Sequence, residues 1–141
     1  MDASTITIIV VAVIFLGSII SAIFFDAPKP YRLRSCQGWN WHRSFPNVPV
    51  KEIRWFLSLF TGAFGFRDKE KLKFNPNDKL LDIYCAIYPI KGMPDALEFE
   101  TLERDLKRKY GIDLRGVWNE ELTLTLGPLF SHARNKGAQK V

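Results

Sequence analysis

The chain has 141 residues, a length that suits one compact domain and leaves little room for a second. Its formal net charge is +5, which raises the question of a nucleic-acid partner. Much of the excess lies near the two ends of the chain, in Lys29, Arg32, Arg34, Arg43, Arg134, Lys136 and Lys140. Because this pattern contains no basic recognition helix, we expect no nucleic-acid partner, and basic residues beside a membrane are the simpler explanation.

The first predicted element is Ser4–Phe25, an apolar stretch without a charge or a proline. As a helix it is long enough to cross about 30 Å of hydrocarbon. A cleaved secretory signal is the alternative, but such a signal begins with positive residues, and only Met1, Asp2 and Ala3 precede this stretch. We therefore predict a transmembrane anchor over residues 1–25, with the lipid bilayer as its partner.

Lysine and arginine flank this stretch on its C-terminal side only. The positive-inside rule then predicts a single-pass protein, of a bacterial inner membrane, with its N-terminus outside and its domain in the cytoplasm. Cys36 and Cys85 are expected to be reduced there, and their spacing forms no metal or redox motif. Cys85 is predicted to be a small core residue, whereas for Cys36 palmitoylation and an unmodified thiol both stay open.

Residues 26–48 combine prolines with an aromatic cluster of Tyr31, Trp39, Trp41 and Phe45. The prolines exclude a continuous helix. Aromatic rings interleaved with basic side chains suit the lipid headgroup layer, with a stacking surface for bases or sugars as the alternative. We predict a juxtamembrane linker.

The folded domain is predicted to cover residues 49–135, followed by a basic tail at 136–141. Pro49 suits the first turn of a helix. One apolar stripe with helical spacing follows it, formed by Ile53, Phe56, Leu57, Phe60 and Phe64. Trp55 makes the other side of this helix apolar as well, so the helix is predicted to be deeply buried or laid against the bilayer.

A charged, turn-rich loop is expected next, closing at Asn75-Pro76-Asn77. The segment KLLDIYCAIYPIKGMP that follows is ambiguous between a short strand and a buried helical turn.

The strongest helix signal lies at residues 94–114. Asp95 is a good N-cap, Glu98 stands three residues later as in a capping box, and Gly111 stands where a helix typically ends. Leu102 and Leu106 belong to an apolar stripe that is expected to face the core. The charges change from acidic to basic along the segment, which matches the helix macrodipole.

The end of the chain gives mixed signals, because the alternation at 122–126 is typical of a strand. A lone strand has no evident partner, so we predict two helices, a very short one from Asn119 and a last one capped by Thr125. Four residues of the last helix share one side, namely Leu126, Leu129, Phe130 and Ala133.

Three short motifs occur in the order found in acyl carrier proteins: DKLLDI, then DALEFETLERDLKRKYGIDL, then TLGPL. Residues 49–135 therefore resemble a degenerate acyl carrier protein domain, as in uncharacterised bacterial carrier-like sequences. The resemblance implies an all-α fold, a small helical bundle. It also puts Ala96 at the position of the phosphopantetheine serine, and because alanine has no hydroxyl, no cofactor is expected.

The key helix leaves an outward face that is a candidate for docking a protein partner. Its residues are Glu98, Glu100, Glu103, Arg104 and Lys107. A solvated charged face is the equal alternative. His42 and His132 have no serine or cysteine motif beside them, so we expect no enzyme, no catalytic residue and no metal.

The predicted function is therefore a membrane-anchored, non-catalytic, acyl-carrier-like interaction domain that faces the cytoplasm. The alternative is a small accessory subunit of a membrane complex, whose transmembrane helix makes the main contact around Gly17, Ser18 and Ser21.

Overall fold

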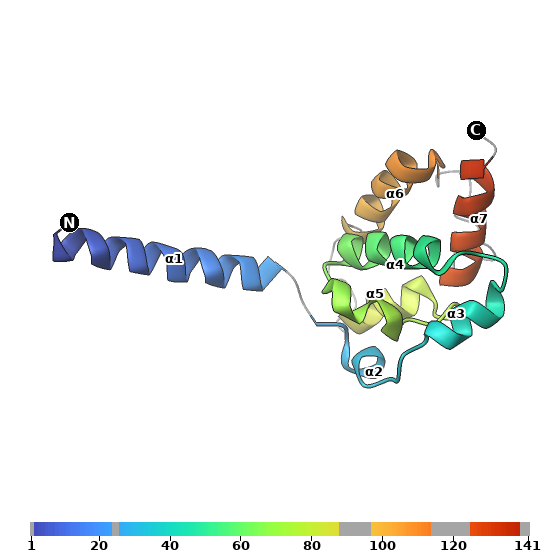
Figure 1. Ribbon diagram of the computed structural model, residues 1–141, viewed down its shortest axis with the longest axis horizontal. Coiled ribbons are helices and arrows are strands. Elements are labelled where there is room, and N and C mark those ends of the chain that lie inside the picture. Colours follow the sequence, from blue (N-terminus) through green and yellow to red (C-terminus); the bar gives the residue numbers. More distant parts are fainter. Residues whose placement is uncertain (1, 24–25, 88–96, 114–124, 139–141) are drawn as a thin grey trace.

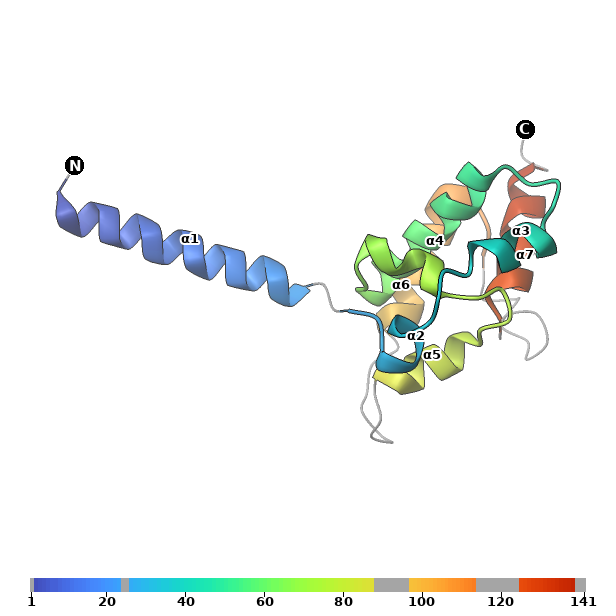
Figure 2. The same ribbon diagram turned by 60° about the horizontal axis from the view of Figure 1, so that its bottom comes forward.

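A computed structural model describes residues 2–23, 26–87, 97–113 and 125–138, with the side chains of all of these except 18–23, 97 and 138 (Figure 1). The described residues form helices and no strand, which confirms the predicted all-α class. Helix α1 (Ala3–Ile23) extends away from the rest, and the other helices surround one aromatic core (Figures 1 and 2).

Helix α1 carries exposed apolar side chains, with Ile8 68% and Phe15 66% exposed. Within the described ranges, no helix combines the length and the apolarity needed to cross a membrane. This finding contradicts the predicted transmembrane anchor at residues 1–25 and the single-pass localisation, with its outside N-terminus and cytoplasmic domain.

Helix α4 (Val50–Phe64) lies at the centre of the domain and follows Pro49, as predicted. Its predicted apolar stripe is buried. The helix ends at Gly65, whose φ of 75° lets the chain turn so that the Phe66 N–H donates to the Thr61 carbonyl at 2.8 Å.

Helix α6 (Leu97–Tyr110) packs against α4 and runs antiparallel to it (Figure 1). The rings of Phe64 and Phe99 meet near one end, and Lys109 lies over the Trp55 ring near the other. Leu102 and Leu106 are fully buried, which confirms the predicted facing of this helix.

The predicted end of α6 is also confirmed, because Gly111 has a φ of 69° and its N–H donates to the Lys107 carbonyl at 2.9 Å. The predicted N-cap, Asp95, lies outside the described residues.

The segment expected to be a linker, residues 26–48, instead contributes to the core. It forms α2 (Lys29–Arg32) and α3 (Gly38–Ser44). Tyr31 is buried and stacks on Phe74 with ring centroids 5.4 Å apart. Trp41 is 1% exposed, and its Nε1–H donates to the Phe74 carbonyl at 2.8 Å. The prediction of lipid-headgroup contacts was therefore wrong for these two rings, because protein surrounds them.

Trp41 lies where three helices of the domain meet. Its ring contacts Phe56 of α4 at 6.4 Å and Phe130 of α7 (Leu126–Ala138) at 6.0 Å between centroids. Phe45, just after α3, meets Phe130 edge-on at 5.1 Å. The apolar side predicted for α7 is confirmed, because Leu126, like Phe130, is fully buried. The very short helix predicted from Asn119 lies outside the described residues.

After α4 the chain forms a 3₁₀ helix, η1 (Asp68–Lys73), a turn at residues 75–78, and α5 (Leu80–Ile87). The segment that was ambiguous between strand and helix is thus helical. Leu80 and Ile83 supply its buried positions, whereas Cys85 is exposed. The core position predicted for Cys85 was wrong, because Leu80 and Ile83 define a different buried face of α5.

The turn at residues 75–78 contacts the segment before α3 through an ion pair and a hydrogen bond. The Asp78 carboxylate accepts the Asn75 backbone N–H at 2.6 Å and pairs with Arg34 at 2.7 Å. The Asn75 side-chain amide donates to Gln37 Oε1 at 2.9 Å. The Arg34 guanidinium also lies over the Tyr31 ring, 4.7 Å from its centroid. These contacts explain why a proline-containing segment is ordered here.

Candidate functional site

The docking face predicted from the sequence lies on α6. Glu100, Arg104 and Lys107 are exposed, whereas Glu98 and Glu103 are half-buried. Glu98 lies one turn before the buried Leu102 and has a buried carboxylate oxygen, whereas the other four charged residues lie on the side of the helix away from the buried leucines. The helix therefore presents them in a fixed orientation.

Ala96, at the position that the carrier resemblance gives to the phosphopantetheine serine, lies outside the described residues. Only the sequence therefore shows that this position lacks a hydroxyl.

A second charged surface lies around Trp55 and did not follow from the sequence. The Trp55 side chain is 53% exposed, although the sequence predicted burial or contact with a bilayer. Lys51 Nζ lies 5.2 Å and Lys109 Nζ 4.3 Å from the centroid of its ring. We call Lys51, Trp55 and Lys109 the basic face. The lysines come from α4 and α6, so only the antiparallel packing of these helices brings them to one ring.

A compact polar cluster joins α4 to η1. The Ser58 hydroxyl donates to Asp68 Oδ1 at 2.6 Å, and Lys71 Nζ donates to Asp68 Oδ2 at 3.0 Å and to Ser58 Oγ at 3.2 Å. The hydrogen bond from Ser58, with that from Lys71, lowers the pKa of Asp68. Serine beside lysine is a known nucleophile and base combination, but an ammonium paired with a carboxylate has no lone pair to accept a proton. The geometry therefore favours a structural role.

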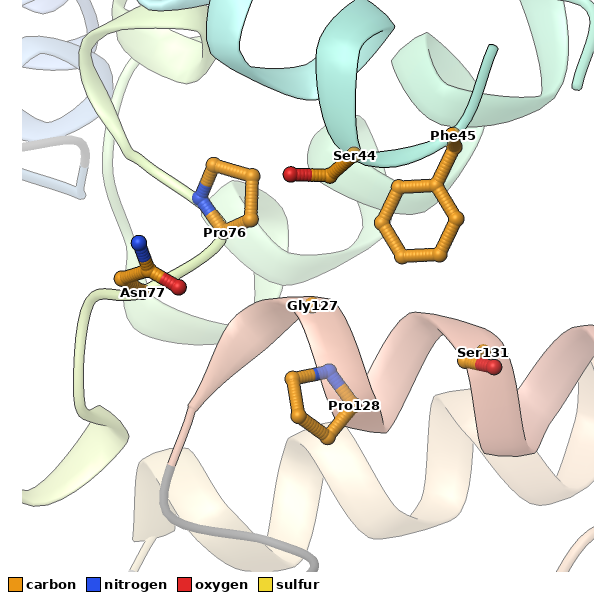
Figure 3. A pocket seen from close by; sticks show the side chains of 7 residues that line it. All are labelled: Ser44, Phe45, Pro76, Asn77, Gly127, Pro128 and Ser131. Atoms are coloured by element: carbon orange, nitrogen blue, oxygen red, sulfur yellow. The ribbon is translucent and has the colours of Figure 1, made fainter.

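An open hollow of about 310 Å³ lies between the end of α3, the turn at 75–78 and the start of α7 (Figure 3). It is lined by Ser44, Phe45, Pro76, Asn77, Gly127, Pro128 and Ser131. None of these side chains is charged.

The start of α7, beside this hollow, does not offer the N–H groups with which helix N-termini bind anions. The Leu126 N–H donates to the Asp78 carbonyl at 3.1 Å, and the Gly127 N–H donates to the Pro76 carbonyl at 2.8 Å. Pro128 has no N–H. The chain's own carbonyls thus occupy these donors, which argues against an anion site.

The two histidines lie apart in the chain, with His42 exposed on α3 and His132 half-buried on α7. In the part of the chain that the structure describes, no three histidine, cysteine, aspartate or glutamate side chains are placed to hold a metal ion. The expectation of a chain without catalytic residues, cofactor or metal stays a prediction.

No family model, curated protein or solved structure matches the chain. The resemblance to acyl carrier proteins therefore rests on the three sequence motifs alone and stays a prediction.

Proposed function

We propose that the helical domain is a non-catalytic protein-interaction domain that docks a partner protein through the outward face of α6. The observation that carries this proposal is the contrast between the two sides of the helix. Leu102 and Leu106 are fully buried, whereas Glu100, Arg104 and Lys107 are exposed. A helix already held by its core loses little conformational freedom on binding. Its charges then select the orientation and the identity of the partner.

The test is a charge swap on α6 that leaves the net charge of the chain unchanged, Glu100→Lys with Arg104→Glu. Partner protein captured by the full wild-type chain should fall about tenfold or more with this variant, because like charges then oppose each other across the interface. The matched control exchanges two exposed charges elsewhere, Lys69→Glu with Asp82→Lys, and should capture the partner normally. Equal capture by both variants would contradict the proposal.

The carrier resemblance adds a narrower proposal, a carrier-like domain that has lost its prosthetic group. Incubation of the full chain with coenzyme A and a broad-specificity phosphopantetheinyl transferase should add no mass, because Ala96 has no hydroxyl. Modification of an Ala96→Ser variant alone would support the relationship to carriers. Modification of the wild-type chain would contradict it.

A second candidate assigns the main partner contact to α1, because its apolar side chains are exposed. Removal of residues 1–25 separates the two candidates. The shortened chain keeps the partner if α6 makes the main contact and loses it if α1 does.

A further inference from the structure

The basic face concentrates positive charge around an exposed aromatic ring. Both lysine ammonium groups lie over the Trp55 indole, which attracts cations through its π electrons and so restrains two otherwise flexible side chains. Their chain neighbours Arg54 and Arg108 are also exposed. The ring thus keeps the two ammonium groups close together at the surface, where a ligand can reach them.

Two acidic residues close to this face in sequence pair with other cations. Glu52 pairs with Arg134 at 2.8 Å, and the Asp105 carboxylate lies 3.7 Å from Arg104. Among the described residues, Lys51 and Lys109 form no ion pair. The positive charge of the face is therefore not neutralised by the described chain, and it complements a negative partner.

We propose that the basic face binds an acidic segment of a partner protein, in which carboxylates flank an apolar side chain. The carboxylates pair with Lys51 and Lys109, and the apolar side chain packs on the exposed part of Trp55. This inference rests on the proposed function as a protein-interaction domain, and it names a second contact surface and its partner chemistry.

The test measures binding of a fluorescent peptide of Glu-Leu-Glu repeats to the full chain by anisotropy, at low salt. A Gln-Leu-Gln peptide of the same length should bind about tenfold more weakly or worse, because it lacks the carboxylates. The variant Lys51→Glu with Lys109→Glu should weaken binding of the acidic peptide by about tenfold or more. The milder variant Lys51→Gln with Lys109→Gln should give an intermediate loss, with circular dichroism confirming that both variants fold.

The matched control is Lys29→Glu with Lys69→Glu, which changes the net charge equally at exposed positions on α2 and η1. This control should keep the peptide affinity within about twofold. Equal weakening by the control would overturn the inference, because net charge alone would then explain binding. Tighter binding of a single-stranded oligonucleotide or of anionic vesicles to the same lysines would also overturn it, since the partner would not be an acidic protein. The inference would also be overturned if the chain dimerised in a concentration-dependent way and Lys51→Glu with Lys109→Glu abolished the dimer. The basic face would then bind a second copy of the chain.

These outcomes are separable from a failure of the proposed function. The charge swap at Glu100 and Arg104 should leave binding of the acidic peptide intact. If the acidic peptide fails to bind, the basic face is not a docking site. The role of α6 is still decided independently, by whether the variant with the swapped charges at positions 100 and 104 captures the partner protein.

Discussion

Replacing Trp41 is the sharpest test of the fold, because the sequence suggested a lipid-facing linker residue and the structure buries it. Trp41→Ala removes a ring that contacts the aromatic rings of α4 and α7. Truncation of a buried aromatic side chain costs about 3–5 kcal/mol. It also leaves the buried Phe74 carbonyl without its donor, a loss of about 1–3 kcal/mol. Because these terms overlap, we expect a total loss of about 4–6 kcal/mol, a large part of the stability of an ordinary domain.

Trp41→Phe separates the two causes, because it keeps most of the packing and removes the indole N–H. We expect this variant to lose about 1–3 kcal/mol. Trp39→Ala is the matched control, because Trp39 is 67% exposed and should cost at most about 0.5 kcal/mol.

The measurement is urea denaturation of the full chain, followed by far-ultraviolet circular dichroism, with the free energy of unfolding taken from the midpoint and slope. Equal midpoints for the alanine variants at positions 41 and 39 would refute the core placement of α3.

Three further predictions concern other helices. Gly127→Ala should destabilise the domain by about 1–3 kcal/mol, because a Cβ at this position would lie 3.1 Å from the Pro76 carbonyl oxygen. Gly62→Ala is the contrasting variant, because a Cβ there would meet no atom within 4 Å, and it should stabilise the domain by up to about 1 kcal/mol. Thermal melts measure both effects. Asp68→Asn should cost under about 1 kcal/mol at neutral pH, because the pKa of this exposed aspartate is lowered by folding. The stabilisation by Asp68 is fully present above the pKa of the unfolded chain, about 3.9, and is lost as the pH falls through the lower pKa of the folded chain. In urea titrations, the difference in stability from wild type should therefore shrink as the pH falls below about 3.9. Leu106→Ala should cost about 2–5 kcal/mol and Glu103→Ala well under 1 kcal/mol, and equal shifts in melting temperature would contradict the facing of α6.

Helices α4, α6 and α7 could be predicted because their apolar side chains recur at helical spacing and their ends carry local signals. Gly111 ends α6 with the positive φ that its lack of a side chain allows. Such information lies within a few residues of chain, so the sequence pattern shows it directly.

The roles of α2 and α3 could not be predicted in the same way. These helices are short, and the burial of Trp41 depends on Phe74, Phe56 and Phe130, which are distant in the sequence. Prolines and exposed basic neighbours made the segment resemble a linker. Its order comes from tertiary contacts that no local pattern encodes.

The charged face of α6 was visible in the sequence, because all its residues lie on one helix. The basic face was not, because Lys51 and Lys109 meet at one ring only after α4 and α6 pack antiparallel. Periodicity also gave no sign that Trp55 is half exposed rather than buried.

The meeting of Trp41 and Phe45 with Phe130 has a consequence for synthesis of the protein on the ribosome. The chain emerges from its N-terminus at about 5–20 residues per second. Several seconds therefore pass between the translation of Trp41 and Phe45 and the translation of Phe130. During this interval the nascent chain exposes aromatic side chains that the finished protein covers. The core of the domain can close only after Phe130 has left the ribosome, and until then its early aromatic side chains are candidates for chaperone binding.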